Sequence, residues 1–206
     1  DALATLGFDY PPRASFFRKQ MVALFEMERD AHIDASTITG SYAGAMGFPQ
    51  FIPTSYQAYA VDFDGDDVID LVNSPADAIG SVASYFAAHK WQPGLPVAAR
   101  ARVDGDDYDA LVKKGYKPGF TLAQARKNGV VAVSCEGDSL SSDYCFDLPA
   151  DTSVAMLDLI GDDGHEFWLV SDNFYVITRY NHSELYAMAV LQLSHRIADA
   201  LEARSL

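Results

Sequence analysis

The chain of 206 residues is long enough to bury a hydrophobic core without help from disulfides or metals. Its hydrophobic content of 49% and charged content of 21% are those of ordinary globular proteins and exclude a disordered chain. The formal charge of -14 disfavours nucleic acid and bare anionic membranes as partners, because such a surface repels phosphate groups. There is no apolar run long enough to span a bilayer, and the first residue is Asp1, which makes a processed or truncated chain plausible.

Helical patterns occupy three stretches of the chain. Apolar residues recur at helical spacing over 13–29, after a pair of prolines. Ser74 and Pro75 form an N-cap signal, and the helical period that follows continues to about His89. A last long helix is predicted from about Asn181 or His182, with one apolar stripe. The members of that stripe are Leu185, Met188, Ala189, Leu193, Ile197 and Leu201.

Short β-prone runs with turn signals between them fill the region 94–172. We expect a small, mainly antiparallel β domain there, with one helix over 121–128 that Gly129 closes. Because this region lies between helical stretches, the predicted fold class is α+β: a helical core with an inserted β domain.

The two cysteines, Cys135 and Cys145, lie in a polar, turn-rich segment. A short loop closed by a disulfide is the favoured interpretation, and it would indicate an oxidising compartment. Two free thiols are the alternative.

The segment 62–70 contains five aspartates, three of which stand at positions 1, 3 and 5 of an EF-hand-like calcium loop. Two departures from that pattern are Asp67 in place of the usual glycine and Asn73 in place of the final glutamate. A solvated acidic turn is the alternative. Asp77 is the expected replacement carboxylate, although it could equally complement the dipole of the helix that it begins. The predicted ligands of a structural Ca²⁺ are Asp62, Asp64, Asp66, the carbonyl of Val68, and Asp77.

Aromatic and amide side chains gather in a glycine-rich segment, 40–53, and near the start of the last helix. Flat rings beside amides and hydroxyls suit sugars, because the C–H faces stack while the hydroxyls form hydrogen bonds. Core packing is the alternative for each ring, and Asn181 with Glu184 resembles a helix capping box. The residues of this group are Tyr42, Phe48, Gln50, Phe51, Tyr85, Tyr175, Tyr180, Asn181 and Tyr186.

Several motifs closely resemble those of the membrane-bound lytic murein transglycosylase B family. The longest is Gly-Ser-Tyr-Ala-Gly-Ala-Met-Gly-Phe-Pro-Gln-Phe-Ile-Pro-Thr-Ser-Tyr over 40–56, which the acidic loop follows. Others are Leu-Gly-Phe-Asp-Tyr-Pro over 6–11, Asp-Ala-Ile-Gly-Ser-Val-Ala-Ser-Tyr-Phe over 77–86, and Asn-Phe-Tyr-Val-Ile-Thr-Arg-Tyr-Asn-His-Ser over 173–183. Their order and spacing make the resemblance specific, and they span nearly the whole chain.

The resemblance implies a lysozyme-like helical core and cleavage of the β-1,4 bond between N-acetylmuramic acid and N-acetylglucosamine in peptidoglycan, with formation of 1,6-anhydromuramic acid. It implies that 1–30 are the remnant of an N-terminal helical domain. It further implies that 31–93 with 173–206 form the core that carries the calcium loop, and that 94–172 form the β domain. The expected partners are peptidoglycan strands and muropeptides, and the expected location is the periplasm or the outer-membrane-associated envelope.

The resemblance also implies which residues bind substrate. Near the scissile bond it places Ser41, Met46 and Gln50, with Phe51 as a wall. It assigns sugar binding or orientation to residues of two later motifs, namely Tyr85, Tyr180, Asn181 and Tyr186. Arg13 matches one of two family arginines and would meet a carboxylate of the substrate.

The catalytic glutamate of that family lies in a Glu-Thr/Ser-x-aromatic-Gly motif upstream of the stretch that corresponds to 6–11, and the sequence lacks this motif. The sequence contains six glutamates, and none of them stands in a motif like that of the catalytic glutamate. They are Glu26, Glu28, Glu136, Glu166, Glu184 and Glu202. We therefore expect the acid to lie outside these residues, by truncation more simply than by loss. The alternatives are a non-catalytic peptidoglycan-binding module with a structural calcium site, and a plain calcium-binding domain.

Overall fold

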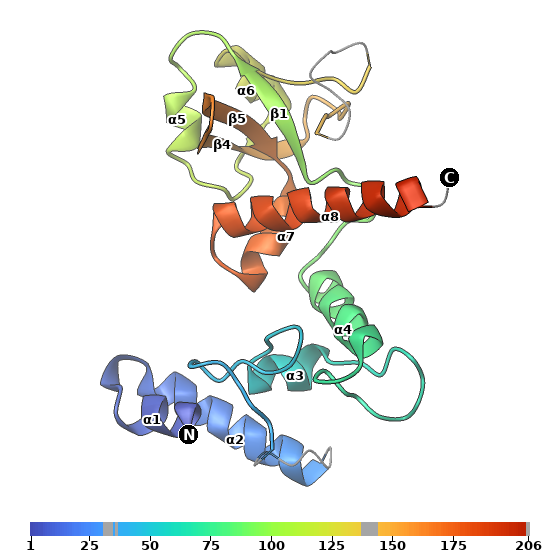
Figure 1. Ribbon diagram of the computed structural model, residues 1–206. Helices are drawn as coiled ribbons and strands as arrows, with labels where there is room; N and C mark the ends of the chain where they lie inside the picture. Colours follow the sequence, from blue (N-terminus) through green and yellow to red (C-terminus); the bar gives the residue numbers. More distant parts are fainter. Residues whose placement is uncertain (31–34, 36, 137–143, 205–206) are drawn as a thin grey trace. The chain divides into compact units, whose positions relative to one another are not determined.

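The computed structural model describes residues 1–30, 35, 37–136 and 144–204, which fall into two compact units (Figure 1). The first unit is Asp1–Ala88 and the second is His89–Leu206. Each unit is described by itself. The grouping of 31–93 with 173–206 in one domain stays a prediction.

The first unit is helical. Its two longer helices confirm the helices predicted over 13–29 and after Ser74-Pro75, whereas the patterns did not predict the two seven-residue helices. In chain order its elements are α1 (Ala2–Phe8), a 3-10 turn (Pro11–Arg13), α2 (Ala14–Asp30), α3 (Pro53–Tyr59) and α4 (Pro75–Ala88).

Helix α2 is the centre of this unit. It packs against α1 and α3, and its buried side recurs at helical spacing through Ala14, Phe17, Ala23 and Met27. Gln20 is also buried on this side, and its Oε1 accepts a hydrogen bond from the backbone N–H of Thr54 at 3.0 Å. Because a buried amide needs partners, this bond fixes the first turn of α3 against α2.

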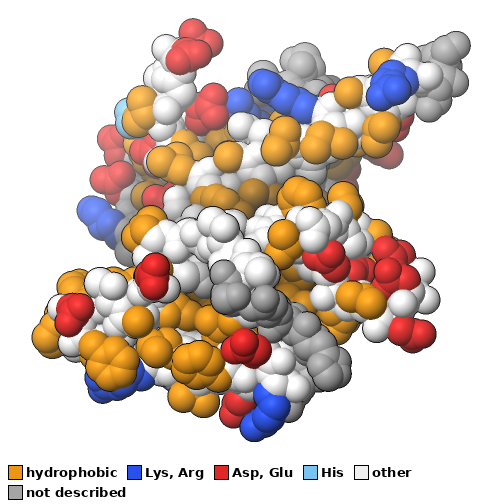
Figure 2. Space-filling model, turned by 60° about the horizontal axis from the view of Figure 1, so that its bottom comes forward, with side chains coloured by type: hydrophobic (Ala, Val, Ile, Leu, Met, Phe, Trp, Pro, Cys, Tyr) orange, Lys and Arg blue, Asp and Glu red, His pale blue; other side chains and the backbone are white. Residues whose placement is uncertain are grey.

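Large apolar side chains remain exposed on α1, α2 and the turn between them. Figure 2 shows hydrophobic side chains gathered over these helices, in the lower part of the view. The exposed members are Phe8, Tyr10, Val22 and Phe25, each at least 46% accessible. The first unit therefore carries an exposed apolar patch on its helical face.

The second unit contains a five-stranded sheet with strand order β2-β4-β5-β1-β3. All strand pairs are antiparallel, which confirms the predicted type of sheet. The fold is therefore a mixture of helices and an antiparallel sheet. The elements in chain order are β1 (Ala98–Val103), α5 (Asp109–Val112), β2 (Phe120–Thr121), α6 (Leu122–Lys127), β3 (Val130–Ala132), β4 (Ser153–Gly161), β5 (Gly164–Val170), α7 (Asp172–Tyr180) and α8 (Glu184–Arg204).

Short helix α6 confirms the helix predicted over 121–128. Thr121 caps it in a reciprocal capping box with Gln124, and Gly129 follows its end with a φ of +74°. A Cβ at Gly129 would meet the carbonyl oxygen of Asp104, so the tight turn into β3 requires glycine.

Trp168 lies at the centre of the sheet and is fully buried. The guanidinium carbon of Arg100 lies 4.3 Å from the centroid of its ring, and Arg100 also forms a 3.1 Å ion pair with Glu166. The ring of Tyr144 meets Trp168 edge-on at 5.2 Å. Neighbouring strands are thus fixed around one indole.

Helix α7, which the patterns did not predict, precedes α8. The predicted start of the last helix at Asn181 or His182 is wrong by two or three residues, because Ser183 caps α8 by accepting a hydrogen bond from the N–H of Tyr186 at 3.2 Å. Asn181 instead ends α7. Of the predicted apolar stripe, Met188 lies on the buried face of α8, which it forms with Ala187 and Leu191. Four of its members are at least 53% exposed: Leu185, Leu193, Ile197 and Leu201.

Cys135 and Cys145 form a disulfide whose Cα atoms are 5.0 Å apart. The carboxylate of Asp147 fastens the same place, since it accepts hydrogen bonds from the Ser134 hydroxyl at 2.7 Å and from the Cys135 N–H at 3.1 Å. The two chain segments that leave β3 and approach β4 are therefore joined covalently and by hydrogen bonds.

Candidate functional site

The glycine-rich segment of the first unit folds around Met46. The N–H and carbonyl of Met46 exchange hydrogen bonds with those of Phe51 at 2.8 and 3.1 Å, and Met46 also bridges Gly40. Gly47 has a φ of +67°, and a Cβ there would collide with the carbonyl of Leu71. Both Met46 and Phe51 are buried, so the segment is a fixed loop.

Gln50 occupies a strained position in this loop. Its φ of +52° lies in the left-handed region, which residues other than glycine adopt rarely and often at functional sites. Its Nε2 donates to the carbonyl of Gly47 at 2.9 Å, and the side chain is exposed. The loop therefore holds the amide of Gln50 at the surface in a defined orientation.

Phe51, Tyr59 and Tyr85 form an aromatic trio beside this loop. The ring centroids of Tyr59 and Tyr85 are 4.9 Å apart, those of Phe51 and Tyr85 are 6.0 Å apart, and those of Phe51 and Tyr59 are 6.4 Å apart. Phe51 and Tyr85 are buried while Tyr59 is half-buried. The structure thus brings together two predicted site residues, and it adds Tyr59, to which the sequence analysis assigned no role.

Ser41 and Met46 line a pocket of about 310 Å³, together with Leu3, Leu24 and Asp1. The hydroxyl oxygen of Ser41 accepts hydrogen bonds from the N–H groups of Ala43 and Ala45 at 3.3 and 3.1 Å. Ser41 therefore holds the turn that forms one wall of the pocket. The amino end of the chain lies in the same pocket.

Arg13 lies at the end of the 3-10 turn, and its guanidinium carbon is 4.6 Å from the ring centroid of Phe16 and 5.2 Å from that of Phe17. Arg13 is exposed, so stacking on these rings leaves its N–H groups accessible to an anion.

In the second unit, Tyr180, Asn181 and Tyr186 lie at the junction of α7 and α8. Asn181 is exposed, and Tyr180 and Tyr186 are half-buried. Burial raises the pKa of the Tyr186 hydroxyl, which keeps it a neutral hydrogen-bond donor. These three predicted residues are therefore neighbours; that they line one groove with the residues of the first unit stays a prediction.

The acidic loop is organised by Asp62. Its Oδ1 accepts hydrogen bonds from the N–H groups of Gly65 and Asp66 at 2.7 and 3.3 Å, and its Oδ2 accepts from the N–H of Asp67 at 2.9 Å. Asp67 adopts a φ of +67°, so it takes the conformation for which glycine is usual at this position.

Asp77 joins the two ends of the loop. It is buried, and its two carboxylate oxygens accept hydrogen bonds from the N–H groups of Phe63 and Asp70 at 2.8 and 2.9 Å. The bonds from Asp70 and Phe63 lower the pKa of Asp77, so its carboxylate is charged at neutral pH. The loop is further anchored by the buried hydroxyl of Tyr56, which donates to the carbonyl of Ile69 at 2.6 Å.

Carboxylate oxygens of Asp62, Asp64 and Asp77 lie within 4.8 Å of one another. Calcium binds oxygen at 2.3–2.6 Å, so two ligands on opposite sides of one ion are roughly 5 Å apart, and the three groups fit around one ion. Asp66 is not in this group; its Oδ1 accepts a hydrogen bond from the N–H of Val68 at 2.8 Å.

The six glutamates all lie in the described part of the chain, and each is half-buried or exposed: Glu26, Glu28, Glu136, Glu166, Glu184 and Glu202. A carboxylic acid that stays protonated near neutral pH needs an apolar, largely buried surrounding. None of these six positions provides it.

A helical unit with an acidic loop and a unit with an antiparallel sheet together match the fold of lytic transglycosylases of known structure. The chain belongs to the transglycosylase SLT domain family, whose sequence profile matches residues 1–195. It is 41% identical over 198 residues to the membrane-bound lytic murein transglycosylase B of Escherichia coli. The match covers 96% of this chain but 50% of that protein, so the chain spans about half the length of its curated relative.

Solved structures agree with this membership. Soluble lytic transglycosylase SltB1 from Pseudomonas aeruginosa superposes with a TM-score of 0.88 at 46% identity, over 98% of this chain and 63% of that one. The Escherichia coli lytic transglycosylase Slt35 in complex with calcium gives 0.77 at 41% identity, over 97% and 59%. SltB3 from Pseudomonas aeruginosa in complex with NAG-NAM-pentapeptide gives 0.74 at 37% identity, over 92% and 48%. Among the helices that the structure describes, none is both long and apolar enough to cross a membrane.

Proposed function

We propose that the chain supplies most of the substrate-binding part of a lytic transglycosylase, which cleaves the bond between N-acetylmuramic acid and N-acetylglucosamine and leaves a 1,6-anhydromuramic acid end. The family supports this function, as do relatives that are named for murein cleavage or were solved with a peptidoglycan fragment. By analogy with the envelope protein that it resembles, we place it in the periplasm or at the outer membrane.

The strained loop beside the aromatic trio is the observation that carries the proposal. The edge-to-face and tilted rings of Phe51, Tyr59 and Tyr85 form an apolar wall of which half-buried Tyr59 is the most accessible member, and the surface amide of Gln50 offers a hydrogen bond to an acetamido or hydroxyl group. Met46 joins this wall through its backbone bonds to Phe51. A glutamine keeps a left-handed backbone only where the surrounding structure compensates for the strain. Such strained residues are typical of binding sites.

The general acid, in our proposal, is a glutamic acid outside these 206 residues. The accessibility of all six glutamates of the chain supports this.

The reaction uses no water. The glutamic acid donates its proton to the glycosidic oxygen as the bond from C1 of the muramic acid breaks. The 6-hydroxyl of the same sugar then forms a new bond to C1 and returns its proton to the carboxylate. In this scheme Gln50 and Tyr85 hold the sugar, and Tyr180, Asn181 and Tyr186 bind the sugar or orient the catalytic group.

Binding of the isolated chain to insoluble murein tests the groove directly. Gln50→Ala is expected to weaken binding by roughly fivefold to tenfold, because it removes one exposed hydrogen-bonding group without disturbing the core. Gln57→Ala, which changes an exposed glutamine of α3, serves as the matched control and is expected to bind as the parent chain does. Cosedimentation at several murein concentrations measures both. Equal binding by the two variants would contradict the role given to Gln50.

We further propose that the acidic loop holds a structural Ca²⁺. Asp62, Asp64 and Asp77 are the carboxylate ligands best placed for it, and Asp66 and the carbonyl of Val68 remain proposed ligands. A relative solved in complex with calcium supports this assignment. The ion would neutralise part of the negative charge of the loop and take no part in the reaction.

Removal of calcium is expected to lower the unfolding midpoint of the first unit by on the order of 10 °C, because a bound ion stabilises the folded state by mass action. In Asp64→Ala the unfolding midpoint should no longer depend on calcium, since the variant loses a ligand. Asp162→Ala, in the exposed turn between β4 and β5, should keep this dependence. Thermal unfolding with calcium and with chelator measures the three proteins, and a parent chain indifferent to chelator would refute the site.

A further inference from the structure

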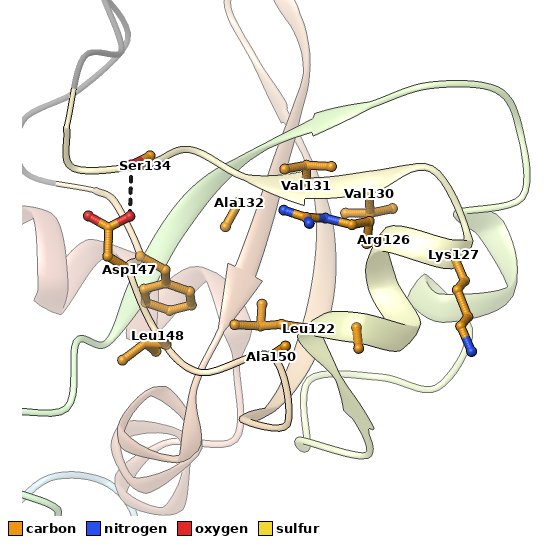
Figure 3. A pocket seen from close by; sticks show the side chains of 12 residues that line it. Leu122, Arg126, Lys127, Val130, Val131, Ala132, Ser134, Asp147, Leu148 and Ala150 are labelled. Atoms are coloured by element: carbon orange, nitrogen blue, oxygen red, sulfur yellow. Dashed lines mark hydrogen bonds between the residues drawn. The ribbon is translucent and has the colours of Figure 1, made fainter.

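A hollow of about 580 Å³ lies in the second unit between α6, β3 and the segment 146–150 (Figure 3). Its lining is mainly apolar and includes Leu122, Val130, Phe146 and Leu148. Main-chain hydrogen bonds close the rim at two corners, from the N–H of Phe146 to the carbonyl of Val133 at 2.9 Å and from the N–H of Ala123 to the carbonyl of Ala150 at 2.8 Å. The hollow is therefore built into the backbone and is formed before any ligand arrives.

One wall of the hollow is the open edge of the sheet. β3 is the last strand and pairs only with β1. Hydrogen bonds on either side of Val131, from Asp104 N–H to Gly129 and from Val133 N–H to Arg100, place Val131 in a pair that bonds to β1. Successive residues of an antiparallel strand direct their N–H and carbonyl groups alternately toward and away from the partner strand. The N–H and carbonyl groups of Val130 and Ala132 therefore point away from β1. These groups bond to no described residue, and both residues line the hollow. Val130 is only 1% exposed, so the groups that a ligand can reach are those of half-buried Ala132.

Two positively charged residues, Arg126 and Lys127, line the hollow. In Figure 3 the side chain of Arg126 extends from α6 along the hollow toward Val130 and Val131, whereas Lys127 points away. Arg126 is exposed, and its guanidinium forms no hydrogen bond or ion pair with any described residue. At the opposite end, both oxygens of Asp147 already accept hydrogen bonds from Ser134 and Cys135. The hollow therefore favours a ligand that carries a carboxylate.

We propose that this hollow binds the carboxylate end of a murein peptide stem, an inference that rests on the proposed function. Arg126 would pair with the terminal carboxylate, and the open N–H and carbonyl of Ala132 would bond to an amide of the peptide as in an added strand. The apolar floor would take the small side chain of a terminal alanine. On a protein of charge -14, one unpaired arginine in a preformed apolar hollow selects a short peptide with a single carboxylate over a polyanion.

Binding of N-acetyl-D-alanyl-D-alanine to the 206-residue chain tests the site, with NMR shifts or calorimetry as the readout. Arg126→Gln should weaken binding roughly tenfold or more, because a charge-assisted bond is lost. Lys127→Gln is the matched control one residue along, and it should stay within about twofold of the parent chain. The C-terminal amide of the same dipeptide should bind as weakly to the parent chain as the acid does to Arg126→Gln.

Equal binding of acid and amide, or equal binding by the two variants, would overturn the site. Tenfold tighter binding of N-acetyl-L-alanyl-L-alanine would also overturn it and would indicate the carboxyl end of a protein partner. The outcome is separable from the proposed function, because no glycan is cleaved in this experiment. Lost dipeptide binding beside normal anhydromuropeptide formation rejects the peptide site alone, and the reverse result rejects the proposed function alone.

Discussion

Extending the chain upstream with a segment that carries a Glu-Thr/Ser-x-aromatic-Gly motif is expected to raise murein cleavage at least about a thousandfold over the 206-residue chain. General acid and base catalysis contributes on the order of a hundredfold to ten-thousandfold. Each glutamate of the isolated chain is half-buried or exposed, so none has the apolar, buried surroundings that such an acid needs. The segment that precedes the matched region in the Escherichia coli relative is a suitable extension.

Two glutamine variants make this experiment decisive. Changing the motif glutamate of the extension to glutamine should return cleavage to the level of the isolated chain. Glu26→Gln within the same extended protein should leave cleavage unchanged, because the carboxylate of Glu26 accepts a surface hydrogen bond from the Nε2 of Gln57 at 3.1 Å and has no part in the proposed chemistry. Efficient cleavage by the isolated chain, or loss of cleavage in Glu26→Gln, would contradict the placement of the acid. An extended protein that binds murein without cutting it would instead favour a binding module.

Tyr85→Ala should have the second large effect, a fall in cleavage by the extended protein of about a hundredfold together with a less stable first unit. Tyr85 is 9% exposed and contacts both other rings of the trio. Truncation of a buried aromatic residue costs roughly 3–5 kcal/mol, and the wall proposed for the sugar would lose its centre. Denaturant unfolding and release of soluble muropeptides measure the two effects.

Tyr42→Ala is the control for this variant. Tyr42 lies in the same glycine-rich segment but is 91% exposed, so its loss should leave the unfolding midpoint unchanged. Tyr85→Phe keeps the ring and should keep most of the stability, which separates a packing role from a role of the hydroxyl. Full cleavage by Tyr85→Ala would exclude the aromatic trio from the substrate-binding site.

Local signals in the sequence were sufficient for the longer elements. The apolar period in α2, the Ser74-Pro75 start of α4 and the cap of α6 each depend on neighbouring residues, so a single sequence carries them. The turn signals around the β runs likewise predicted an antiparallel sheet. Helices α1 and α3 have only seven residues each, too few for a clear period, and tertiary contacts such as that of Gln20 with Thr54 form them.

The exposed stripe on α8 shows where periodicity misleads. Residues spaced by four form one line along a helix, but the face that packs in the second unit lies around Ala187, Met188 and Leu191. The spacing predicted an apolar line correctly and could not indicate which line is covered. The sequence also offers two overlapping cap signals for α8, one at Asn181 and one at Ser183. Only the backbone geometry of the folded chain selects between them, and it selects Ser183 as the cap.

At the candidate site, residue types were predictable but several roles were not. Asp77 was expected as a replacement metal ligand or a helix-dipole partner; it also joins the two ends of the loop, from the N–H of Phe63 to that of Asp70. Tyr59 joins the trio across 26 residues from Tyr85, a contact that no local pattern encodes. The left-handed backbone of Gln50 follows from the hydrogen bonds of its loop with Met46 and Gly47, which exist only in the folded unit.

The products of murein cleavage by the extended protein test the central claim most directly. Mass spectrometry after reaction in oxygen-18 water should detect muropeptides that are lighter by one water than their reducing counterparts and carry no heavy oxygen, because the 6-hydroxyl of muramic acid closes the ring. Reducing muramic acid ends that carry the heavy isotope would show that water is the nucleophile, and would contradict the assignment as a lytic transglycosylase.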